Sequence, residues 1–452
     1  MLYTLPGYRE DGFQSTQKSC KAMTSAKYLS RVFTMAAACR RFGRTALAVM
    51  ALAPTFAHAG ALYFYEMSNA SETGYAGVGM TARANDSGTV FTNPAGMMQF
   101  DESAMLAGAT GVYIDAGFKT NSNNTVTGRS AGVNKRVIPA GSFSYLRPLN
   151  DKWSVGISAH NYFGLAIDWP ADWVGRASSV NVAILAPQLQ PTVGYRVNDW
   201  LSVGAGAALT LGYLREKLRP DALTPGGFPD AKTRISDTDF AVQGNFGFML
   251  EPWDHTRIGI RYLTETDLDF EDDPDTSWRD PLGQALGSPN IDLDLGITMP
   301  QEIQVAVHHR LNDRLNLLGG IGWAEISQFG RIQVDIDDNG IPGTTVNEDF
   351  RDVWNFGIAT EFQWTPATQL TAGLHMDTSM STDRTRPITI PLGTLYRYAI
   401  GFKHQPRKDG VTVGGGLSYV YEGNLPVADT AAGTAGKYKN VALWIFSFYG
   451  KW

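Results

Sequence analysis

The feature that most constrains this chain is a strict alternation of apolar with polar or small residues, which recurs from about residue 104 to the end. In 201–213, Leu, Val, Ala and Tyr alternate with Ser, Gly, Ala and Thr. In 353–364, Trp, Phe and Ile alternate with Asn, Gly and Glu. A period of two residues is that of a β-strand. Aromatic residues lie at the ends of the apolar face, which is typical of strands that cross a membrane and line a polar lumen.

The spacing of the strands indicates the architecture. We expect fourteen strands, over residues 104–116, 138–147, 152–163, 184–197, 200–213, 239–251, 256–270, 301–311, 314–328, 351–364, 368–378, 395–405, 411–422 and 440–452. The connections alternate between short turns and long polar loops rich in Gly, Pro, Asp and Asn. Short periplasmic turns and long outer loops are the pattern of outer-membrane barrels. The sequence therefore predicts an all-β fold, a 14-stranded antiparallel transmembrane β-barrel.

The last strand supports this prediction independently. Trp444, Phe446, Phe448 and Trp452 share one face, and Trp452 is the last residue. A soluble edge strand as apolar as this one would invite aggregation. A terminal aromatic residue on an alternating strand is instead what outer-membrane assembly machinery reads.

The N-terminal 59 residues have the form of an export signal. Arg40, Arg41 and Arg44 precede an apolar stretch over 46–56, and Ala57-His58-Ala59 forms a small-x-small cleavage site. We expect the mature chain to begin at Gly60, and Met35 to be a more natural start than Met1. The apolar stretch is too short to span a bilayer as a helix.

Removal of residues 1–59 changes the composition of the chain. Cys20 and Cys39 are the two cysteines, so the mature chain would have none. The removed part carries eight of the 38 Lys and Arg residues and two of the 44 Asp and Glu residues, which leaves 30 against 42, a net charge of −12. This acidic balance argues against nucleic acid as a partner.

Residues 60–103 do not follow the strand pattern. They are rich in Gly, Ala, Ser and Asn, and they precede the first expected strand. A barrel of fourteen strands leaves a lumen, because about eight strands already suffice for side chains to fill the interior. We therefore expect residues 60–103 to form an N-terminal hatch that plugs the lumen of a barrel over 104–452.

Several motifs of this segment resemble the hatch of the FadL-type long-chain fatty acid transporters. They are Gly74-Tyr75-Ala76-Gly77-Val78-Gly79, Ala84-Asn85-Asp86-Ser87-Gly88 and Asn93-Pro94-Ala95-Gly96-Met97. The resemblance continues in Phe163-Gly164-Leu165-Ala166, Asp172-Trp173-Val174-Gly175-Arg176, Ile326-Ser327-Gln328-Phe329 and Arg386-Pro387-Ile388-Thr389-Ile390-Pro391. It covers essentially the whole mature chain.

The resemblance implies a transport route. In that family a ligand moves from the outer loops to a pocket near the hatch N-terminus and leaves sideways through an opening at a kinked third strand. The corresponding residues are Tyr63 and Phe64 for ligand binding, Asn93, Pro94 and Ala95 for the hatch motif, and Gly156, Asn161 and Phe163 for the opening. An apolar ligand gains about 0.8 kcal/mol per buried CH₂ by leaving water, which favours an exit into the bilayer.

The resemblance also implies a pocket for a fatty acid carboxylate, formed by basic residues. The matching positions carry Arg215 and Arg351, and Arg351 replaces a lysine of the family, which keeps the charge and changes the hydrogen-bond geometry. The alternative is that both are loop bases paired with the adjoining Glu216 and Asp352. The sequence leaves these two readings evenly balanced.

Three other motifs resemble nucleotide-binding or metal-binding sites, but the residues around them do not fit such sites. Gly77 to Ala82 fits a dinucleotide-binding pattern but follows no strand, and we expect no helix after it. Asp335 to Gly340 matches the first half of a calcium-binding EF-hand loop, but Val346 stands where its glutamate belongs. His308 and His309 should face opposite sides of a strand. We predict no catalytic residues, no cofactor and no metal site.

The sequence thus predicts a protein of the Gram-negative outer membrane that is not an enzyme. Our first hypothesis is uptake of long-chain fatty acids by diffusion with lateral exit into the membrane. The alternative is an uptake porin for neutral hydrophobics such as aromatic hydrocarbons or alkanes. An outer-membrane enzyme would need a nucleophile and base pair on neighbouring strands, and the sequence shows none. An adhesin would act through the long loops, for which sequence patterns give no test. We expect a monomer that contacts outer-membrane lipid and lipopolysaccharide.

Overall fold

A computed structural model describes residues 62–135, 137–219, 232–272, 274–279, 285–286, 293–336, 344–407, 410–428 and 433–452. The expected export signal lies outside these residues, and so do Gly60 and most of the EF-hand-like loop. Among the described residues, no helix is both long and apolar enough to cross a bilayer.

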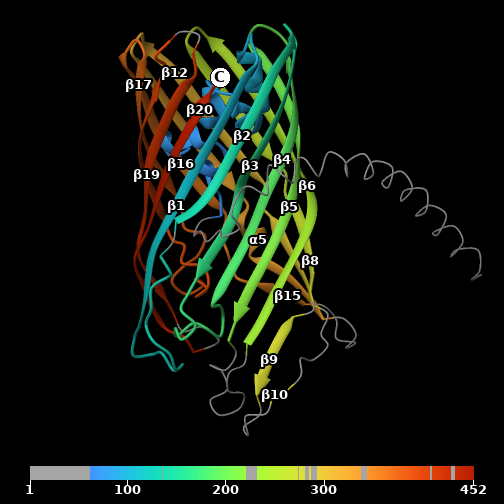
Figure 1. Cartoon of the computed structure of the whole chain (residues 1–452), viewed down its shortest axis with the longest axis vertical. Helices are drawn as coiled ribbons and strands as arrows, with labels where there is room; N and C mark the ends of the chain where they lie inside the picture. Colours follow the sequence, from blue (N-terminus) through green and yellow to red (C-terminus); the bar gives the residue numbers. More distant parts are fainter. Residues whose placement is uncertain are drawn as a thin grey trace, which may run out of the picture. The chain divides into compact units, whose positions relative to one another are not determined.

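Within this part of the chain, fourteen strands form one closed antiparallel sheet (Figure 1). In order around the ring they are β1 (Ala104–Thr120), β2 (Val137–Asn150), β3 (Trp153–Asp168), β4 (Asn181–Arg196), β5 (Leu201–Leu218), β6 (Lys232–Trp253), β7 (Thr256–Leu263), β12 (Glu302–Asn312), β13 (Leu315–Ala324), β16 (Val353–Thr365), β17 (Thr368–Asp377), β18 (Leu395–His404), β19 (Thr412–Val427) and β20 (Gly436–Lys451). The predicted fold class is confirmed. The ring closes between the first and last strands, where Met105 and Trp452 exchange two backbone hydrogen bonds of 3.0 and 2.9 Å.

Shorter strands extend this ring beyond its long-loop end. They are β8 (Thr266–Asp272), β11 (Leu293–Met299), β14 (Arg331–Ile336) and β15 (Thr344–Asn347) in a four-stranded sheet, and β9 (Asp275–Arg279) and β10 (Ala285–Leu286) beside β6. The expected single strand 256–270 is interrupted at Thr264 and Glu265. The expected strand 314–328 is wrong at its end, because Ile326–Phe329 form helix α5. Ile326 and Phe329, the first and last residues of α5, are both buried. In a strand, two residues three positions apart would point to opposite faces.

The two faces of the barrel differ as the alternation predicts. On the outward face Ile358, Ile400 and Phe448 are more than 60% exposed, whereas inward-facing Gln243 and Glu361 are buried. An outward apolar band exposed to this extent is the surface that lipid covers. Tryptophans lie at or beside the short turns at one end of the barrel, namely Trp153, Trp200, Trp253 and Trp364, and Trp452 follows the last strand.

The segment Leu62–Gln99, called the inner segment below, lies inside the ring of strands (Figure 1). It consists of short helices, α2 (Tyr65–Ser68), η1 (Ala70–Tyr75), α3 (Met80–Arg83), α4 (Thr89–Thr92) and η2 (Pro94–Gln99). From Leu62 to Met98 every residue except Asn85 is buried. The expectation that no helix follows Gly79 is wrong, since α3 begins at Met80, but four residues are one turn and make no dinucleotide site.

Candidate functional site

The Asn93-Pro94-Ala95 motif fixes one side of the inner segment to the barrel wall. The Asn93 side chain caps η2 by accepting a hydrogen bond from Ala95 N at 3.1 Å. Its Nδ2 donates to Thr81 O at 2.7 Å, within the inner segment, and to Phe248 O at 3.0 Å, in β6. One buried amide therefore joins the inner segment to itself and to the wall.

The wall accommodates this motif through glycines that face it. A Cβ atom on Gly247 would lie 2.1 Å from Asn93 Oδ1, and one on Gly204 would lie 2.4 Å from Pro94 C. Real Cβ atoms do not come this close to their neighbours. Both strand positions therefore need glycine for the inner segment to approach the wall as it does.

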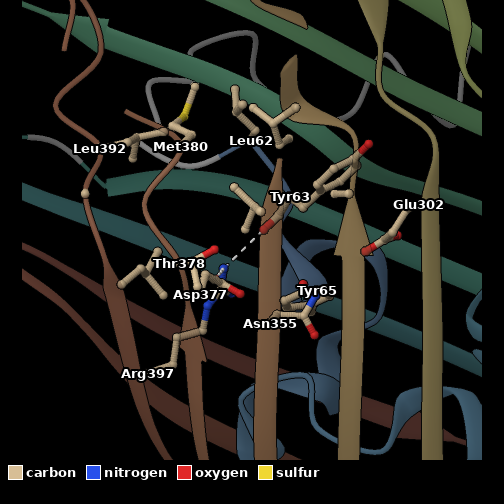
Figure 2. A pocket seen from close by; sticks show the side chains of 15 residues that line it. Leu62, Tyr63, Tyr65, Glu302, Asn355, Asp377, Thr378, Met380, Leu392 and Arg397 are labelled. Atoms are coloured by element: carbon tan, nitrogen blue, oxygen red, sulfur yellow. Dashed lines mark hydrogen bonds and ion pairs between the residues drawn. The ribbon is translucent and has the colours of Figure 1, made fainter. Parts of the chain in front are cut away.

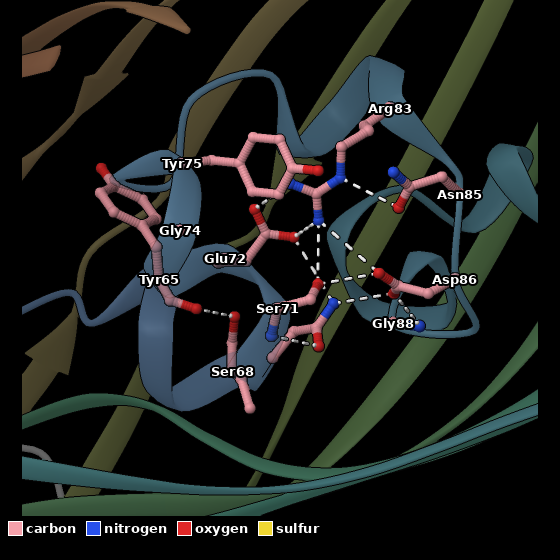
Figure 3. A network of polar contacts seen from close by, with 12 residues as sticks. Tyr65, Ser68, Ser71, Glu72, Gly74, Tyr75, Arg83, Asn85, Asp86 and Gly88 are labelled. Atoms are coloured by element: carbon pink, nitrogen blue, oxygen red, sulfur yellow. Dashed lines mark hydrogen bonds and ion pairs between the residues drawn. The ribbon is translucent and has the colours of Figure 1, made fainter. Parts of the chain in front are cut away.

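A charged network stabilises the centre of the inner segment (Figure 3). The Arg83 guanidinium donates to Glu72 Oε2 at 3.1 Å, lies 3.7 Å from Asp86 Oδ2 and stacks on the Tyr75 ring, 3.9 Å from its centroid. Asp86 also accepts hydrogen bonds from Ser71 and Asn69, at 2.8 and 2.9 Å. These side chains are buried, and their pairing makes the burial of their charges tolerable.

This network is continuous with the opposite side of the barrel. The Tyr75 hydroxyl donates to Glu361 Oε1 at 2.7 Å, and Asn85 Nδ2 donates to the same oxygen at 3.1 Å. Glu361 belongs to β16, and its other oxygen is 3.3 Å from His308 Nε2. The inner segment is thus held by neutral amides on the β6 side and by charges on the β16 side.

The barrel wall is incomplete between β2 and β3. Among the described residues, the ladder between these strands runs only from Asn150–Trp153 to Phe143–Ala159. Beyond it, residues 137–142 of β2 pair with β1 alone, and residues 160–168 of β3 remain paired with β4. The third strand therefore separates from the second over its outer half.

The residues expected on the third strand lie at this separation and below it. Gly156 is in the paired part and packs against the inner segment, where an added Cβ would lie 2.5 Å from Val90. Asn161 and Phe163 flank a β-bulge in the β3–β4 ladder. With its nitrogen facing the wall, the Asn161 amide reaches the carbonyl oxygens of Phe163 and Ala186. A bulge bends its strand, which accounts for the divergence from β2.

The start of the inner segment occupies the edge that β2 leaves. Phe64 N donates to Tyr162 O, and Gly164 N donates to Leu62 O, both at 2.9 Å. Tyr63 lies opposite Phe163 in an isolated antiparallel bridge, and its hydroxyl donates to Pro300 O at 2.7 Å. Tyr63, Phe64 and Phe163, all expected at functional positions, are therefore brought together.

A pocket lies beside this bridge, inside the barrel (Figure 2). Its lining comes from the inner segment and from the strands and loops of the opposite wall: Leu62, Tyr63, Tyr65, Glu302, Ala324, Ile326, Val353, Asn355, Asp377, Thr378, Met380, Leu392, Gly393, Leu395 and Arg397. Leu62, Met380 and Leu392 lie toward one end of the pocket, and Asn355, Tyr65 and Arg397 lie toward the other (Figure 2). The pocket thus has an apolar part and a polar floor.

The charges of the floor are paired with one another. Arg397 Nη1 donates to Glu66 Oε2 at 2.9 Å, and Nη2 lies 3.5 Å from Asp377 Oδ2. His375 Nε2 is 2.7 Å from the other Asp377 oxygen. Arg397 Nη2 also donates to Tyr63 O at 3.3 Å, so this arginine fixes the start of the inner segment as well.

Glu302 forms a second compensated group at the pocket. It pairs with Arg261, and both side chains are at most 1% exposed. The Tyr162 hydroxyl lies 2.9 and 2.8 Å from the two Glu302 oxygens, and Gln304 Nε2 donates to Glu302 at 2.7 Å. A carboxylate that accepts this many hydrogen bonds has little capacity left for a ligand.

The two arginines expected to bind a carboxylate lie elsewhere. Arg215 is in β5, in register with Ala183 and Ser236. The inward positions of β5 are even-numbered, among them Ala208, Thr210 and Leu214, so Arg215 and Glu216 point to opposite faces. Arg351 is exposed and precedes β16. In the described part of the chain, neither arginine lines the pocket.

Sequence reasoning missed the charged residues that surround the pocket, Glu66, Arg261, Glu302, Asp377 and Arg397. A signal was present for two of them. Arg261 and Arg397 are long cations on the inward face of membrane-crossing strands, where ionisable residues are rare and usually functional. The alternation of inward and outward positions along each strand would have identified these two arginines. The positions matched to the family instead pointed to Arg215 and Arg351.

The sequence is similar to those of known outer membrane transport proteins. Residues 50–445 match the family model described as "Outer membrane protein transport protein (OMPP1/FadL/TodX)". The long-chain fatty acid transport protein of Escherichia coli O6:H1 is 24% identical over 440 residues, covering 90% of this chain and 97% of that protein. Outer membrane protein P1 of Haemophilus influenzae is 26% identical over 342 residues, covering 66% of this chain and 73% of P1.

Solved structures show the same fold. A Pseudomonas aeruginosa FadL homologue superimposes with a TM-score of 0.74 at 20% identity, covering 87% of this chain and 99% of that one. The Pseudomonas putida toluene transporter TodX gives a TM-score of 0.61 at 16% identity, covering 87% and 98%. At sequence identities of 16% and 20%, this structural similarity establishes the fold alone.

Proposed function

Because the chain belongs to the OMPP1/FadL/TodX family of outer membrane transport proteins, we propose that it takes up a hydrophobic small molecule by diffusion through the pocket and out through the barrel wall. The observation that carries the proposal is the loss of β2–β3 pairing at the level where Leu62 and Tyr63 line the pocket. Leu62 and Tyr63 therefore both line the pocket and lie along the edge of β3 that β2 leaves.

In this proposal the inner segment is the hatch. Residues 1–59 are the export signal, 60–103 the hatch and 104–452 the barrel. The bonds of Asn93 to the wall and the charged network around Arg83 hold the body of the hatch. The bridge of Tyr63 to Phe163 is the part that opens, because its attachment is small. It consists of two backbone hydrogen bonds to β3 and the contacts of Tyr63 with Pro300 and Arg397. We expect a monomer, surrounded by outer-membrane lipid and lipopolysaccharide.

Long-chain fatty acids are one candidate substrate. The supporting observation is the similarity along the chain to proteins named long-chain fatty acid transport protein. A carboxylate ligand needs an available cation, and Arg215 and Arg351 are the residues first proposed for it.

Neutral hydrophobics such as aromatic hydrocarbons are the second candidate, favoured by the pocket. Its one lining cation, Arg397, is already paired with Glu66 and Asp377, and its lining carboxylates are Glu302 and Asp377. Matched structures include a toluene transporter and a monoaromatic hydrocarbon channel. We favour the neutral class on the strength of this charge balance.

Uptake measurements test the proposal. A Gram-negative host that lacks its own FadL-type protein would express the full chain or an empty vector, and would receive radiolabelled oleate or toluene in parallel. We expect uptake of at least one compound to rise above the vector control. Equal uptake with and without the chain, for a barrel shown by heat-modifiable gel mobility to be folded, would contradict the proposal.

A further inference from the structure

The pocket contains one polar side chain that the protein does not use itself. Asn355 lies on the inward face of β16, is 4% exposed and lines the pocket. Within the described part of the chain its amide makes no side-chain hydrogen bond, although the charged floor residues around it are all paired. Buried amides are normally hydrogen-bonded, so an amide that faces a cavity without a protein partner is available to bind a ligand.

The neighbouring wall is built around this amide. A Cβ atom on Gly322, the residue opposite Asn355 in β13, would lie 2.5 Å from Asn355 Nδ2. Any larger residue at 322 would push the amide away from its position. The absence of a side chain there therefore allows the amide to lie against β13 at the polar end of the pocket (Figure 2).

We propose that Asn355 is a specificity-determining residue that binds the hydroxyl or carbonyl group of a neutral, otherwise apolar ligand in this pocket. This inference rests on the proposed function and deepens it by naming the ligand class. An asparagine side chain offers both N–H donors and a carbonyl acceptor, so it serves a hydroxyl or a carbonyl equally. Leu62, Met380 and Leu392 supply the apolar surface for the rest of the molecule.

The charges around the amide exclude an anion. Three carboxylates, Glu66, Asp377 and Glu302, contact the guanidinium groups of Arg397 and Arg261 and the imidazole of His375. Each of these basic groups therefore already has a carboxylate partner. A ligand carboxylate beside Asn355 would meet Glu302 and Asp377, which line the same pocket. Such a juxtaposition of like charges rejects the wrong ligand. A neutral ligand with a single hydrogen-bonding group avoids this repulsion and satisfies the amide.

Three ligands that share one ring separate these contributions. Toluene, benzyl alcohol and benzoate would be titrated against the full chain in lipid nanodiscs, with empty nanodiscs subtracted, by calorimetry or ligand-observed NMR. We expect benzyl alcohol to bind roughly threefold to tenfold more tightly than toluene, which is the effect of one added hydrogen bond. Benzoate should bind more weakly than either.

Two variants of equal size assign the effect to the amide. In Asn355→Leu the preference should reverse in favour of toluene, because the hydroxyl of benzyl alcohol would be buried without a partner, while toluene affinity is retained. In Asn355→Asp the loss of the donor and the added charge should weaken benzoate binding further. Heat-modifiable gel mobility establishes that both variants are folded barrels.

The outcomes distinguish the inference from the function on which it rests. An unchanged preference in Asn355→Leu, or benzoate binding as tight as benzyl alcohol, would overturn the role of Asn355 while leaving hydrophobic transport intact. If none of the three compounds binds and the expressed chain supports no uptake, both the inference and the proposed function fail.

Discussion

Tyr63 and Phe163 lie opposite each other in an isolated antiparallel bridge, with ring centroids 5.4 Å apart, at the level where β3 has parted from β2. The edge of β3 would otherwise present unpaired backbone groups, which proteins normally cover. Here Leu62–Phe64 cover it. Leu62 and Tyr63 of this stretch also line the pocket. A displacement of the stretch therefore changes both the wall and the pocket.

A disulfide across the bridge should block transport. In the variant Tyr63→Cys/Phe163→Cys, the two backbone hydrogen bonds lie on either side of the cysteine pair and not within it. The Cα atoms of such a non-hydrogen-bonded pair are about 4.5 Å apart, a distance that a disulfide can span. No other cysteine follows residue 59. We expect ligand uptake to fall at least tenfold in the oxidised variant and to recover on reduction, measured by radiolabelled uptake in cells.

A second pair of cysteines provides the control. Tyr145 and Ile157 are partners in the part of the β2–β3 ladder that remains intact. Their cross-link would tie strands that are already paired, and uptake should stay at the parent level with or without reductant. The lateral route is wrong if the Tyr63–Phe163 cross-link forms fully and uptake persists.

Gly247→Ala should loosen the hatch. The new methyl group would lie 2.1 Å from Asn93 Oδ1, so Asn93 must move and weaken its bonds to Thr81 and Phe248. Such overpacking costs about 1–3 kcal/mol. We expect higher ion conductance in planar bilayers and faster proteolysis within the hatch, with the barrel still folded by gel mobility.

Gly319→Ala is the matched control for this variant. Gly319 is also in a barrel strand, but an added Cβ there would have its nearest contact at 4.0 Å, with Gly357 O. Conductance and proteolysis of this variant should equal those of the parent. Parent-like behaviour of Gly247→Ala as well would mean that close packing at the Asn93 motif does not secure the hatch.

The barrel was predictable from the sequence because each part of the pattern has a local cause. Alternation fixes which side chains of 201–213 face lipid, and short turns such as Asn198-Asp199 fix which strands are neighbours. The errors lie where tertiary contact overrides the pattern. Residues 326–329 form one helical turn where a strand end was expected, because this turn buries both Ile326 and Phe329.

The pocket was less predictable because its chemistry depends on pairs distant in sequence. Glu66 and Arg397 are 331 residues apart, and neither has a local motif that announces the other. The resemblance placed Tyr63, Phe64 and Phe163 in one region, and they do lie together. It placed the ligand charge on Arg215 and Arg351, whereas the pocket contains Arg397 and an unused amide on Asn355.

Acid should loosen the contact between two outer loops, which backbone hydrogen bonds between Arg129 and residues 172 and 174 also join. Arg129 Nε donates to Asp172 Oδ2 at 2.7 Å, and this hydrogen bond holds the pKa of Asp172 below its ordinary value. A lowered pKa in the folded state means that the contribution to stability is present above about pH 4, the ordinary carboxyl value, and is lost as the pH falls below it. We expect protease cleavage near Arg129, normalised at each pH to cleavage of an unstructured peptide by the same protease, to be constant from pH 7 to 5 and to rise below pH 4.

Arg129→Gln should remove the pH dependence of this loop. The variant lacks the cation that lowers the Asp172 pKa, so its cleavage should show no step below pH 4. Both side chains are more than half exposed, so the effect should be confined to the loop and leave the thermal stability of the barrel unchanged. A step of equal size in the variant would assign the acid response to another group.

The Arg397–Glu66 pair should govern how readily the start of the hatch opens. Arg397→Met leaves Glu66 buried without its partner, which costs about 3–5 kcal/mol, and removes the bond to Tyr63 O. We expect the Phe64 amide, which is bonded to Tyr162 O, to exchange its hydrogen roughly a hundredfold faster. Adding Glu66→Gln removes the stranded charge and should recover most of this effect.

An exposed ion pair provides the control. Arg310→Met breaks the pair of Arg310 with Asp313, whose side chains are 48% and 92% exposed, and it should leave the exchange of the Phe64 amide unchanged. If Arg397→Met and Arg310→Met behave alike, the buried pair does not restrain the hatch, because an exposed pair contributes too little to do so.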